Sequence, residues 1–518
     1  MKRIRRVLLL FLTLCLLVLS GCAPREAETD GTAPTDTLAG MHGKKIGVMT
    51  GSVYDQFIKE QVPDCTIEFI NVNTDLAVAL DAGKIDAYLA DEPMARYMLA
   101  EYPDQYICAQ MVKTPYAFIF QKNNEKSDHL RAQMNEFLAE LRADGTLDAL
   151  GDLWYGSTDD SKHVIDREGM NGENGTLTFA VSSDIGVPIT YVKDGQCVGY
   201  DIDIAVRFCK RYGYRLEIAD TNVSGMLAGV AAGRFDFGAG SIAITPEREE
   251  AMNFSDPDYD GSIVLVAKRA NAAGREDGFL RFLRGIRDSF HKTFVREGRY
   301  RLFLSGLGVT ALITVVSAFC GTMLGFMFFL LYRRRLRLTN AILNVWMDVM
   351  QKTPVVLILM ILYYLVFGSF ELGGVWVSVI GFSMLFSCAV VGLLKTATGA
   401  VEEGQMEAAL ALGYTEVGAF LRIILPQAMR HFLPGYISEI VSLIKSTAIV
   451  GYIAVQDLTK VSDIVRSRTY EAFFPLVVSA VIYYLYAWLM TAVVLYFRRC
   501  TDPKRRTREQ ILKGVNRK

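Results

Sequence analysis

The stretch from Glu407 to Pro426 reads E-A-A-x3-G-x9-I-x-L-P, and its residue types suit noncovalent recognition of a protein partner. Glu407, Ala408 and Ala409 predict the start of a short helix whose small side chains allow close approach, and Gly413 predicts its end. A second helix is expected after Gly413, with Pro426 as its stop. Such a pair of helices can lay an apolar face into a groove on a partner, so that movement of the partner moves the flanking segments.

This pattern resembles the coupling loop of ABC-transporter permeases, although the residues alone also fit an Ala-rich amphipathic loop. The resemblance implies a transporter subunit that contacts a separate ATPase. The sequence has no G-x-x-x-x-G-K-[ST] stretch, and therefore no phosphate-cradling loop of that kind. We expect that the chain is not an enzyme, that it holds no cofactor or metal, and that ATP binds to the partner ATPase. Pairing of two copies of this permease, or of one copy with a second permease, remains open.

The elements around this loop are expected to cross a membrane. The chain has 518 residues, of which 51% are hydrophobic, and a formal net charge of -1 gives no footprint for nucleic acid. Beyond about Arg301 the hydrophobic residues form runs of membrane-spanning length. We assign 276–300 to an amphipathic lead-in helix, 301–500 to an all-α permease domain and 501–518 to a cytoplasmic tail. Five spans are predicted, at about 303–332, 341–367, 372–394, 434–455 and 473–497.

Charges beside the spans predict their orientation. Basic residues that follow the first and fifth spans are expected on the cytoplasmic side: Arg333, Arg334, Arg335, Arg337, Arg498, Arg499, Lys504, Arg505 and Arg506. The loop at 407–426 then lies inside, as coupling requires. Lys460, Arg466 and Arg468 fall on the expected outside, against this trend. Lys445 lies in an apolar run, where a charge is costly unless it faces a cavity or partner, so it is a candidate for the translocation path; snorkelling to an interface is the alternative.

The N-terminus predicts export. Residues 1–21 join a basic stretch to an apolar one, which is the layout of a signal peptide. The tetrad L-S-G-C that ends at Cys22 resembles a bacterial lipobox, which implies cleavage before Cys22 and lipidation of its thiol. Residues 22–42 then form a flexible tether to membrane lipid. An uncleaved first membrane helix is the alternative, although the apolar run is short for a span. Disulfides are permitted but not indicated by spacing for four exported cysteines: Cys65, Cys108, Cys197 and Cys209.

Two segments before the spans have the alternation of an α/β fold. From 44 to 156 and from 176 to 269, strand-like apolar runs alternate with amphipathic helical stretches, which predicts largely parallel sheets. The stretches 75–93 and 225–243 share one pattern: a helix, an Ala-Gly pair, a basic residue, an apolar residue, Asp, and a strand. A glycine that ends a helix explains this punctuation locally. Its recurrence predicts two similar lobes.

Both segments resemble the solute-binding proteins of the polar amino-acid family, which have the two-lobed type II periplasmic-binding fold. GYDIDIAVRFCKRYG at 199–213 resembles the family's signature, and LRADGTLDALGDLWYG at 141–156 resembles its C-terminal end. Because the C-terminal part comes first here, the resemblance implies a circularly permuted domain at 43–269. Its family C-terminal half is 43–156 and its family N-terminal half is 174–269. Two truncated modules, or halves that pair between neighbouring protomers, are the alternatives.

The resemblance also implies a ligand site for an amino acid. Arg248 matches the arginine that binds the ligand's α-carboxylate, and a guanidinium fork suits a carboxylate bidentately, which lysine does not. Asp91 matches the acid that receives the α-ammonium. Ser241 matches a polar position on the loop before Arg248, and Thr245 is assigned to the same site. Ser52, which follows a glycine, is interpreted as a helix N-cap whose exposed amides add anion-binding capacity.

The expected site departs from the family in its side-chain pocket. Residues 185–189 and Val223 supply no aromatic side chain where the family usually has them, and Ala243 replaces a common Ser or Thr. The ligand is therefore expected to have a small or polar side chain that does not depend on stacking. Without the resemblance, Arg248 also fits a surface salt bridge and Asp91 a strand-end turn.

The leading interpretation is one subunit of an amino-acid ABC importer that joins receptor and permease. It is expected in the bacterial cytoplasmic membrane, with its binding domain outside and its C-terminus inside. A ligand-gated ion channel or receptor on the same binding fold is the alternative, but it predicts a pore loop and a filter that we do not find in the sequence. An exported enzyme on this scaffold lacks a paired acid and base in a clear setting.

Overall fold

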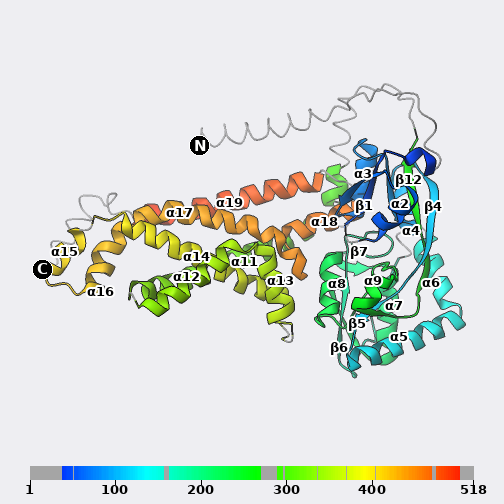
Figure 1. Cartoon of the computed structure of the whole chain (residues 1–518), viewed down its shortest axis with the longest axis horizontal. Helices are drawn as coiled ribbons and strands as arrows, with labels where there is room; N and C mark the ends of the chain where they lie inside the picture. The colour runs from blue at the N-terminus through cyan, green and yellow to red at the C-terminus, as the bar shows by residue number, and fades with distance from the viewer. Residues whose placement is uncertain are drawn as a thin grey trace.

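The computed structural model describes residues 38–50, 52–156, 163–269, 289–295, 298–334, 336–368, 370, 372–402, 404–469 and 474–501. The predicted signal peptide, Cys22, most of the tether, residues 276–288 and nearly all of the tail lie outside them. An α/β part lies at one end of an elongated bundle of helices (Figure 1).

The first lobe of the α/β part is a mixed sheet with the strand order β2-β1-β3-β12-β4. Its strands are β1 Lys45–Met49, β2 Thr66–Ile70, β3 Ala87–Asp91, β4 Gln105–Tyr116 and β12 Tyr259–Lys268. Three helices pack on it: α2 Tyr54–Gln61, α3 Asn73–Asp81 and α4 Glu92–Glu101. β1 is parallel to β2 and β3, whereas β12 is antiparallel to β3 and β4. The prediction of largely parallel sheets is therefore wrong for half of this sheet.

The second lobe is a mixed sheet with the strand order β11-β5-β10-β6-β9. Its strands are β5 Ile119–Gln121, β6 Thr176–Val181, β9 Arg215–Asp220, β10 Phe237–Gly238 and β11 Met252–Phe254. A separate hairpin joins β7 Tyr191–Lys193 to β8 Gln196–Val198. The helices are α5 Glu125–Ala143, α6 Thr146–Tyr155, α7 Tyr200–Tyr212, α8 Val223–Ala231 and α9 Pro246–Ala251. Buried phenylalanines fill its core: Phe118, Phe120, Phe179, Phe208 and Phe237.

Each lobe contains strands from both sequence segments. β12 belongs to the second segment but lies between β3 and β4, and β5 belongs to the first segment but lies between β10 and β11. The chain passes from one lobe to the other twice, between β4 and β5 and between β11 and β12. Removing either segment would therefore take strands out of the middle of both sheets.

This interlacing predicts cooperative unfolding. A fragment containing residues 38–269 is expected to unfold in one transition, because neither lobe keeps a complete sheet when the other segment is lost. Denaturant titration followed by circular dichroism and by tyrosine fluorescence should give coincident curves. Two separated transitions, or folding only as a dimer, would contradict this expectation.

The repeated Ala-Gly pattern forms equivalent helix ends in the two lobes. After α3, Gly83 adopts a φ of 67°, and after α8, Gly233 adopts a φ of 72°. A left-handed residue is the conformation in which glycine ends a helix at little cost. β3 and β10 follow these turns, one in each sheet. The predicted helix ends are confirmed.

Among the described residues, four helical stretches are long and apolar enough to cross a membrane: α11 Tyr300–Arg333, α14 Gly374–Gly399, Glu416–Ile453 and Phe474–Tyr496, the last within α19 Phe474–Thr501. A bent pair, Arg337–Lys352 (α12) with Val355–Val366 (α13 Val355–Met360 and the turn after it), makes up to five. α11 packs closely on α14 because Gly321 and Gly325 face it; a Cβ on Gly325 would meet the Ser387 carbonyl oxygen at 2.7 Å.

The second predicted span is not one straight helix. The chain bends by 109° between α12 and α13, at Thr353 and Pro354. Proline has no N–H to donate, and it disfavours a helical conformation in the residue before it. Thr353 accordingly has a ψ of 132°. The predicted range 341–367 therefore combines two differently directed helices.

The fourth predicted span begins too late in the sequence. Helix continues from Glu416 through α17 Leu425–Ser446 to Ile453, and Pro434 lies inside α17 instead of at its start. Pro426 does not stop a helix: it is the second residue of α17, and helical residues continue on both sides of it. Of the predicted lead-in helix, residues 289–295 are described and are helical, with His291–Val295 as their last turn, while 276–288 and 296–297 lie outside the described residues.

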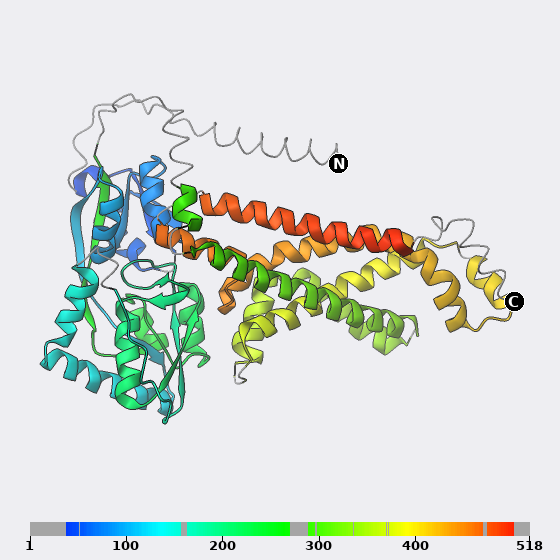
Figure 2. The same cartoon turned by 180° about the vertical axis from the view of Figure 1, so that it is seen from behind.

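The two ends of the bundle meet different elements. At one end α18 Leu458–Thr469 lies against the α/β part, and at the far end lie the short helices α15 Gly404–Ala411 and α16 Glu416–Ala419 (Figures 1 and 2). A change at the α/β part must therefore act along the length of the bundle to reach α15 and α16.

Candidate functional site

Four of the five predicted ligand residues line one small cavity between the lobes. Ser52 and Asp91 come from the first lobe, and Ser241 and Arg248 from the second. The cavity has a volume of about 40 Å³. The ends of β1 and β3 bring Ser52 and Asp91 to one edge of the first sheet, and the loop after β10 carries Ser241. Residues up to 196 positions apart in the sequence therefore share one site.

Asp91 is the buried acid of this cavity and is only 2% exposed. Its Oδ1 accepts hydrogen bonds from the Tyr54 hydroxyl at 2.7 Å and from the Tyr116 hydroxyl. Burial raises the pKa of Asp91 to about 6, although the two hydroxyls lower it. A buried carboxylate of this kind gains most from a positively charged partner.

Arg248 lies on α9, the short helix that follows the loop after β10 in the second lobe. Its backbone N–H donates to Thr245 Oγ1 at 3.4 Å, so Thr245 caps α9 instead of lining the cavity. The Arg248 guanidinium donates to the Ala243 carbonyl oxygen at 3.1 Å. Thr245 thus fixes the start of the helix that carries Arg248, and Arg248 itself lines the cavity.

Ser52 is not the N-cap that the sequence suggests. α2 begins at Tyr54 and its N-cap is Val53, without a side-chain hydrogen bond. The Ser52 hydroxyl donates to the Met49 carbonyl oxygen at 2.7 Å and accepts from the Tyr54 N–H at 3.4 Å. The turn before α2 is one residue longer than the predicted cap requires, yet Ser52 still reaches the cavity.

Three site residues were not identified from the sequence: Tyr54, Tyr116 and Asn73. Tyr54 lines the cavity, and Tyr116, at the end of β4, hydrogen bonds to Asp91 beside it. Asn73, 2% exposed, donates to the Ile185 carbonyl oxygen of the other lobe at 3.3 Å. Its Oδ1 is buried without a hydrogen-bond partner among the described residues. The only sequence signal for Asn73 is a polar residue at the start of an apolar helix.

The residues that differ from the family's usual side-chain pocket line this cavity. Ile185 and Val223 both line it, as does Ala243. Tyr54 of the first lobe also lines the cavity. The expected lack of aromatic residues concerns the second-lobe positions, which are aliphatic as the sequence states.

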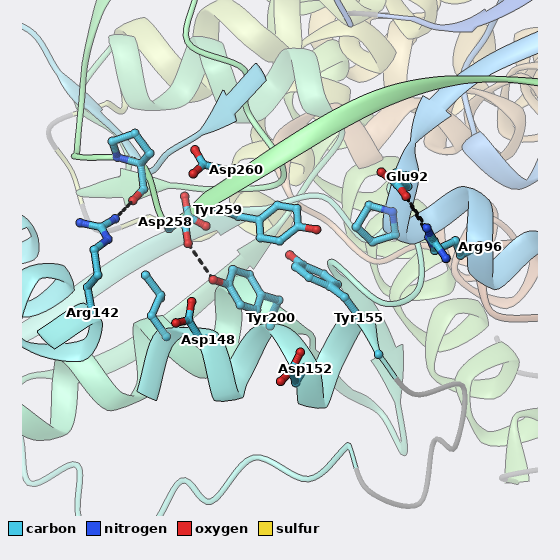
Figure 3. Close-up of a pocket in the computed structure, with 15 residues that line it drawn as sticks. Glu92, Arg96, Arg142, Asp148, Asp152, Tyr155, Tyr200, Asp258, Tyr259 and Asp260 are labelled. Carbon is cyan, nitrogen blue, oxygen red and sulfur yellow. Dashed lines mark hydrogen bonds and ion pairs between the residues drawn. The ribbon is translucent and has the colours of Figure 1, made fainter. Parts of the chain in front are cut away.

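A larger cavity of about 640 Å³ lies elsewhere on the α/β part and shares no lining residue with the first (Figure 3). Tyr155, Tyr200 and Tyr259 pack on one another there, with ring centroids 4.5 to 6.0 Å apart. Carboxylates surround them, including Asp258, whose pKa burial raises. None of the predicted ligand residues lines this cavity, and its two arginines, Arg96 and Arg142, already bind Glu92 and the Pro257 carbonyl oxygen.

The predicted coupling loop forms two short helices at the far end of the bundle. α15 starts at Gly404, three residues before Glu407, and Gly413 adopts a φ of 85° after it. Ala409 is buried, whereas Leu412 is 79% and Val417 is 68% exposed. Apolar side chains thus protrude around Gly413, as a surface for a partner requires.

Lys445, the translocation-path candidate, has an exposed side chain on α17. A cavity of about 510 Å³ among the membrane helices is lined by Glu439, Ser442 and Ser446, but not by Lys445. Among the described residues, no disulfide joins Cys65, Cys108, Cys197, Cys209, Cys320 or Cys388.

The basic residues that contradicted the charge pattern bind the α/β part. Lys460 Nζ lies 2.8 Å from Asp184 Oδ1 of the second lobe. Arg466 pairs with Asp75 of the first lobe. The Arg468 guanidinium lies over the Tyr191 ring, 5.0 Å from its centroid. These charges are buried against acidic and aromatic partners, so they do not report on membrane orientation.

The chain is similar to known solute-binding proteins and to known permeases. Residues 177–457, more than half of the chain, match the model of the bacterial extracellular solute-binding proteins, family 3, and the chain belongs to this family. The arginine transport system permease protein ArtQ of Bacillus subtilis is 31% identical over 195 residues, which cover 37% of this chain and 88% of that protein. The putative glutamine transport system permease protein GlnP of Rickettsia felis is 30% identical, with the same coverage. A crystal structure of an amino acid ABC transporter with histidines is 26% identical and covers 43% of this chain and 99% of its own, with a TM-score of 0.36.

Together these findings define an amino-acid ABC importer in which a solute-binding domain and a permease are joined in one chain. It is a multi-pass protein of the bacterial inner membrane. The chain is a transporter component and not an enzyme, because the ATPase is a separate subunit in such systems.

Proposed function

We propose that the cavity between the lobes is where this importer captures its amino acid. The observation that carries the proposal is the convergence of Ser52, Asp91, Ser241 and Arg248 on one cavity. Arg248 and Asp91 offer opposite charges, as the two ends of a zwitterion require. The unpartnered Oδ1 of Asn73 can accept a hydrogen bond from the α-ammonium.

A small or polar amino acid is the ligand that the site favours. The aliphatic residues Ile185 and Val223 line the cavity from the second lobe, so recognition of the ligand's side chain does not depend on aromatic stacking from that lobe. The relatives named above include permeases for arginine and for glutamine, so both amino acids belong in the first panel of ligands.

The finer architecture is also proposed. The order of the segments and the interlaced sheets support a circularly permuted type II binding domain at 43–269. If the bent pair is one span, the permease has five, which supports an arrangement with its two ends on opposite sides, the binding domain outside and the C-terminus inside. A lipid on Cys22 would add a second anchor after the signal peptide is removed.

The coupling loop is proposed to bind the ATPase. Its exposed apolar residues and its place at the far end of the bundle support this role. The permease would work as a dimer, either of two copies of this chain or with a second permease. Closure of the lobes on ligand and ATP binding at the loop would then act on the same helices from opposite ends.

Ligand binding is expected to weaken in acid. The α-ammonium needs an ionised Asp91, and burial raises the pKa of Asp91 to about 6 in the ligand-free site. Binding must therefore expel a proton below this pH, and affinity should fall by about tenfold for each pH unit below about 6. Calorimetry from pH 7.5 to pH 4.5 measures it. Asp91→Asn should remove this dependence, and an unchanged pH profile in that variant would assign the titration to another group.

A further inference from the structure

Next to the ligand cavity lies another cavity, of about 140 Å³, between the α/β part and the membrane helices; it is called the second cavity here. Both lobes and the permease contribute to its wall, including Met49 from the first lobe, Asp184 and Val223 from the second, and Gly451 and Lys460 from the permease. It therefore exists only where the receptor rests on its own permease.

Met49 and Val223 line both this cavity and the ligand cavity. They are 6% and 8% exposed and come from opposite lobes. Because no other residue lines both spaces, these two side chains form the partition between them. A methionine is unbranched and flexible, and a small separation of the lobes would move the two side chains apart.

Lys460 provides the positive charge of the second cavity. Its Nζ lies 2.8 Å from Asp184 Oδ1 and 3.6 Å from Asp220 Oδ1, and Lys460 is only 4% exposed. Burial lowers the pKa of Lys460, but the two carboxylates more than offset this and hold it above its usual value, so the side chain stays charged. Asp457 and Asp463 also line the cavity, which gives its wall more negative than positive groups.

We propose that the second cavity is a transfer site that receives the amino acid from the inter-lobe site before it enters the membrane helices. In this site Lys460 binds the α-carboxylate, which replaces Asp184 as its partner, and the facing carboxylates hold the α-ammonium. The inference deepens the proposed function and rests on it, because it assumes that the ligand starts beside Arg248.

Gly451 offers a steric test. It lines the cavity, and a Cβ added there would meet only the Lys460 side chain, at 3.8 Å. Gly451→Ala should therefore be tolerated, whereas Gly451→Leu should fill the space. In full-length protein reconstituted with its ATPase, Gly451→Leu is expected to reduce uptake of L-glutamine and L-arginine at least tenfold. Its affinity for both ligands without ATP should stay within about twofold of the parent. Parental uptake by Gly451→Leu would overturn the proposal.

The charge test separates ligand binding from docking. Lys460→Met should lower uptake of both amino acids, but it should raise the ratio of arginine to glutamine uptake severalfold, because the wall becomes more negative. Lys460→Arg should keep the parental ratio. Lys268→Met, which breaks an exposed ion pair with Asp81, is the matched control. A fall in uptake with an unchanged ratio would show that Lys460 only docks the two parts, and it would overturn the transfer site.

The two proposals fail in different ways. If Arg248→Ala binds both amino acids as tightly as the parent, the inter-lobe site itself is wrong. If Arg248→Ala loses binding while Gly451→Leu transports normally, the inter-lobe site stands and only the transfer site is lost.

Discussion

Replacing Arg248 with alanine is expected to weaken amino-acid binding by about a hundredfold, or roughly 3 kcal/mol. Arg248 lines the cavity between the lobes, and the loss of its guanidinium would leave the ligand carboxylate desolvated and unpaired. Arg248→Lys should recover little of this affinity, because one ammonium group cannot reproduce a bidentate contact. Calorimetry of the full chain against glutamine, arginine and small polar amino acids measures both variants.

Arg211→Ala is the control for this substitution. Arg211 forms an ion pair with Glu140, its side chain is 55% exposed, and it lies away from the cavity. Its removal should change affinity by less than about twofold. If the Arg248 and Arg211 variants bind the amino acid equally well, Arg248 does not contact the ligand, and the ligand binds elsewhere.

Replacing Gly413 with valine is expected to abolish transport while leaving ligand binding intact. Gly413 has a φ of 85°, a conformation that a β-branched residue adopts only at a cost of about 1–3 kcal/mol. No atom lies within 4 Å of an added Cβ, so the effect must come from the backbone turn between α15 and α16. Uptake by proteoliposomes that contain the ATPase, with ligand affinity measured in parallel, separates the two effects.

Gly399→Val is matched to it, since Gly399 also has open space around an added Cβ but lacks a positive φ. This variant should transport at close to the parental rate. Glu407→Lys should behave like Gly413→Val if the exposed end of α15 touches the ATPase. Transport by Gly413→Val at the parental rate would remove the coupling role from this loop.

The two-lobed organisation could be predicted because its signals are local. The Ala-Gly helix ends depend on one residue each, and Gly83 and Gly233 show the expected backbone. Arg248 and Asp91 were also assigned to the site in advance, and both line the inter-lobe cavity. Their convergence could not be derived from spacing, because it depends on how β12 and β5 interlace the lobes.

What the sequence did not reveal depends on contacts between distant parts. Tyr54 and Tyr116 bind Asp91 across the first lobe, and neither tyrosine has a distinctive neighbourhood in the sequence. Lys460 appeared to contradict the charge pattern until its partners were seen, which are Asp184 and Asp220, more than 200 positions earlier. The bend at Pro354 was missed because the hydrophobicity of the range conceals a change of direction.

The position of β12 determines how the receptor bears mechanical load. β12 is the last strand before the permease, yet it lies inside the first sheet with β3 on one side and β4 on the other. A force applied to the chain at Arg269 acts along β12, and it loads the hydrogen bonds to β3 and to β4 in shear. An edge strand could be peeled away one bond at a time. The interior strand can leave only if both ladders break together, so the receptor can be moved by its permease without losing its fold.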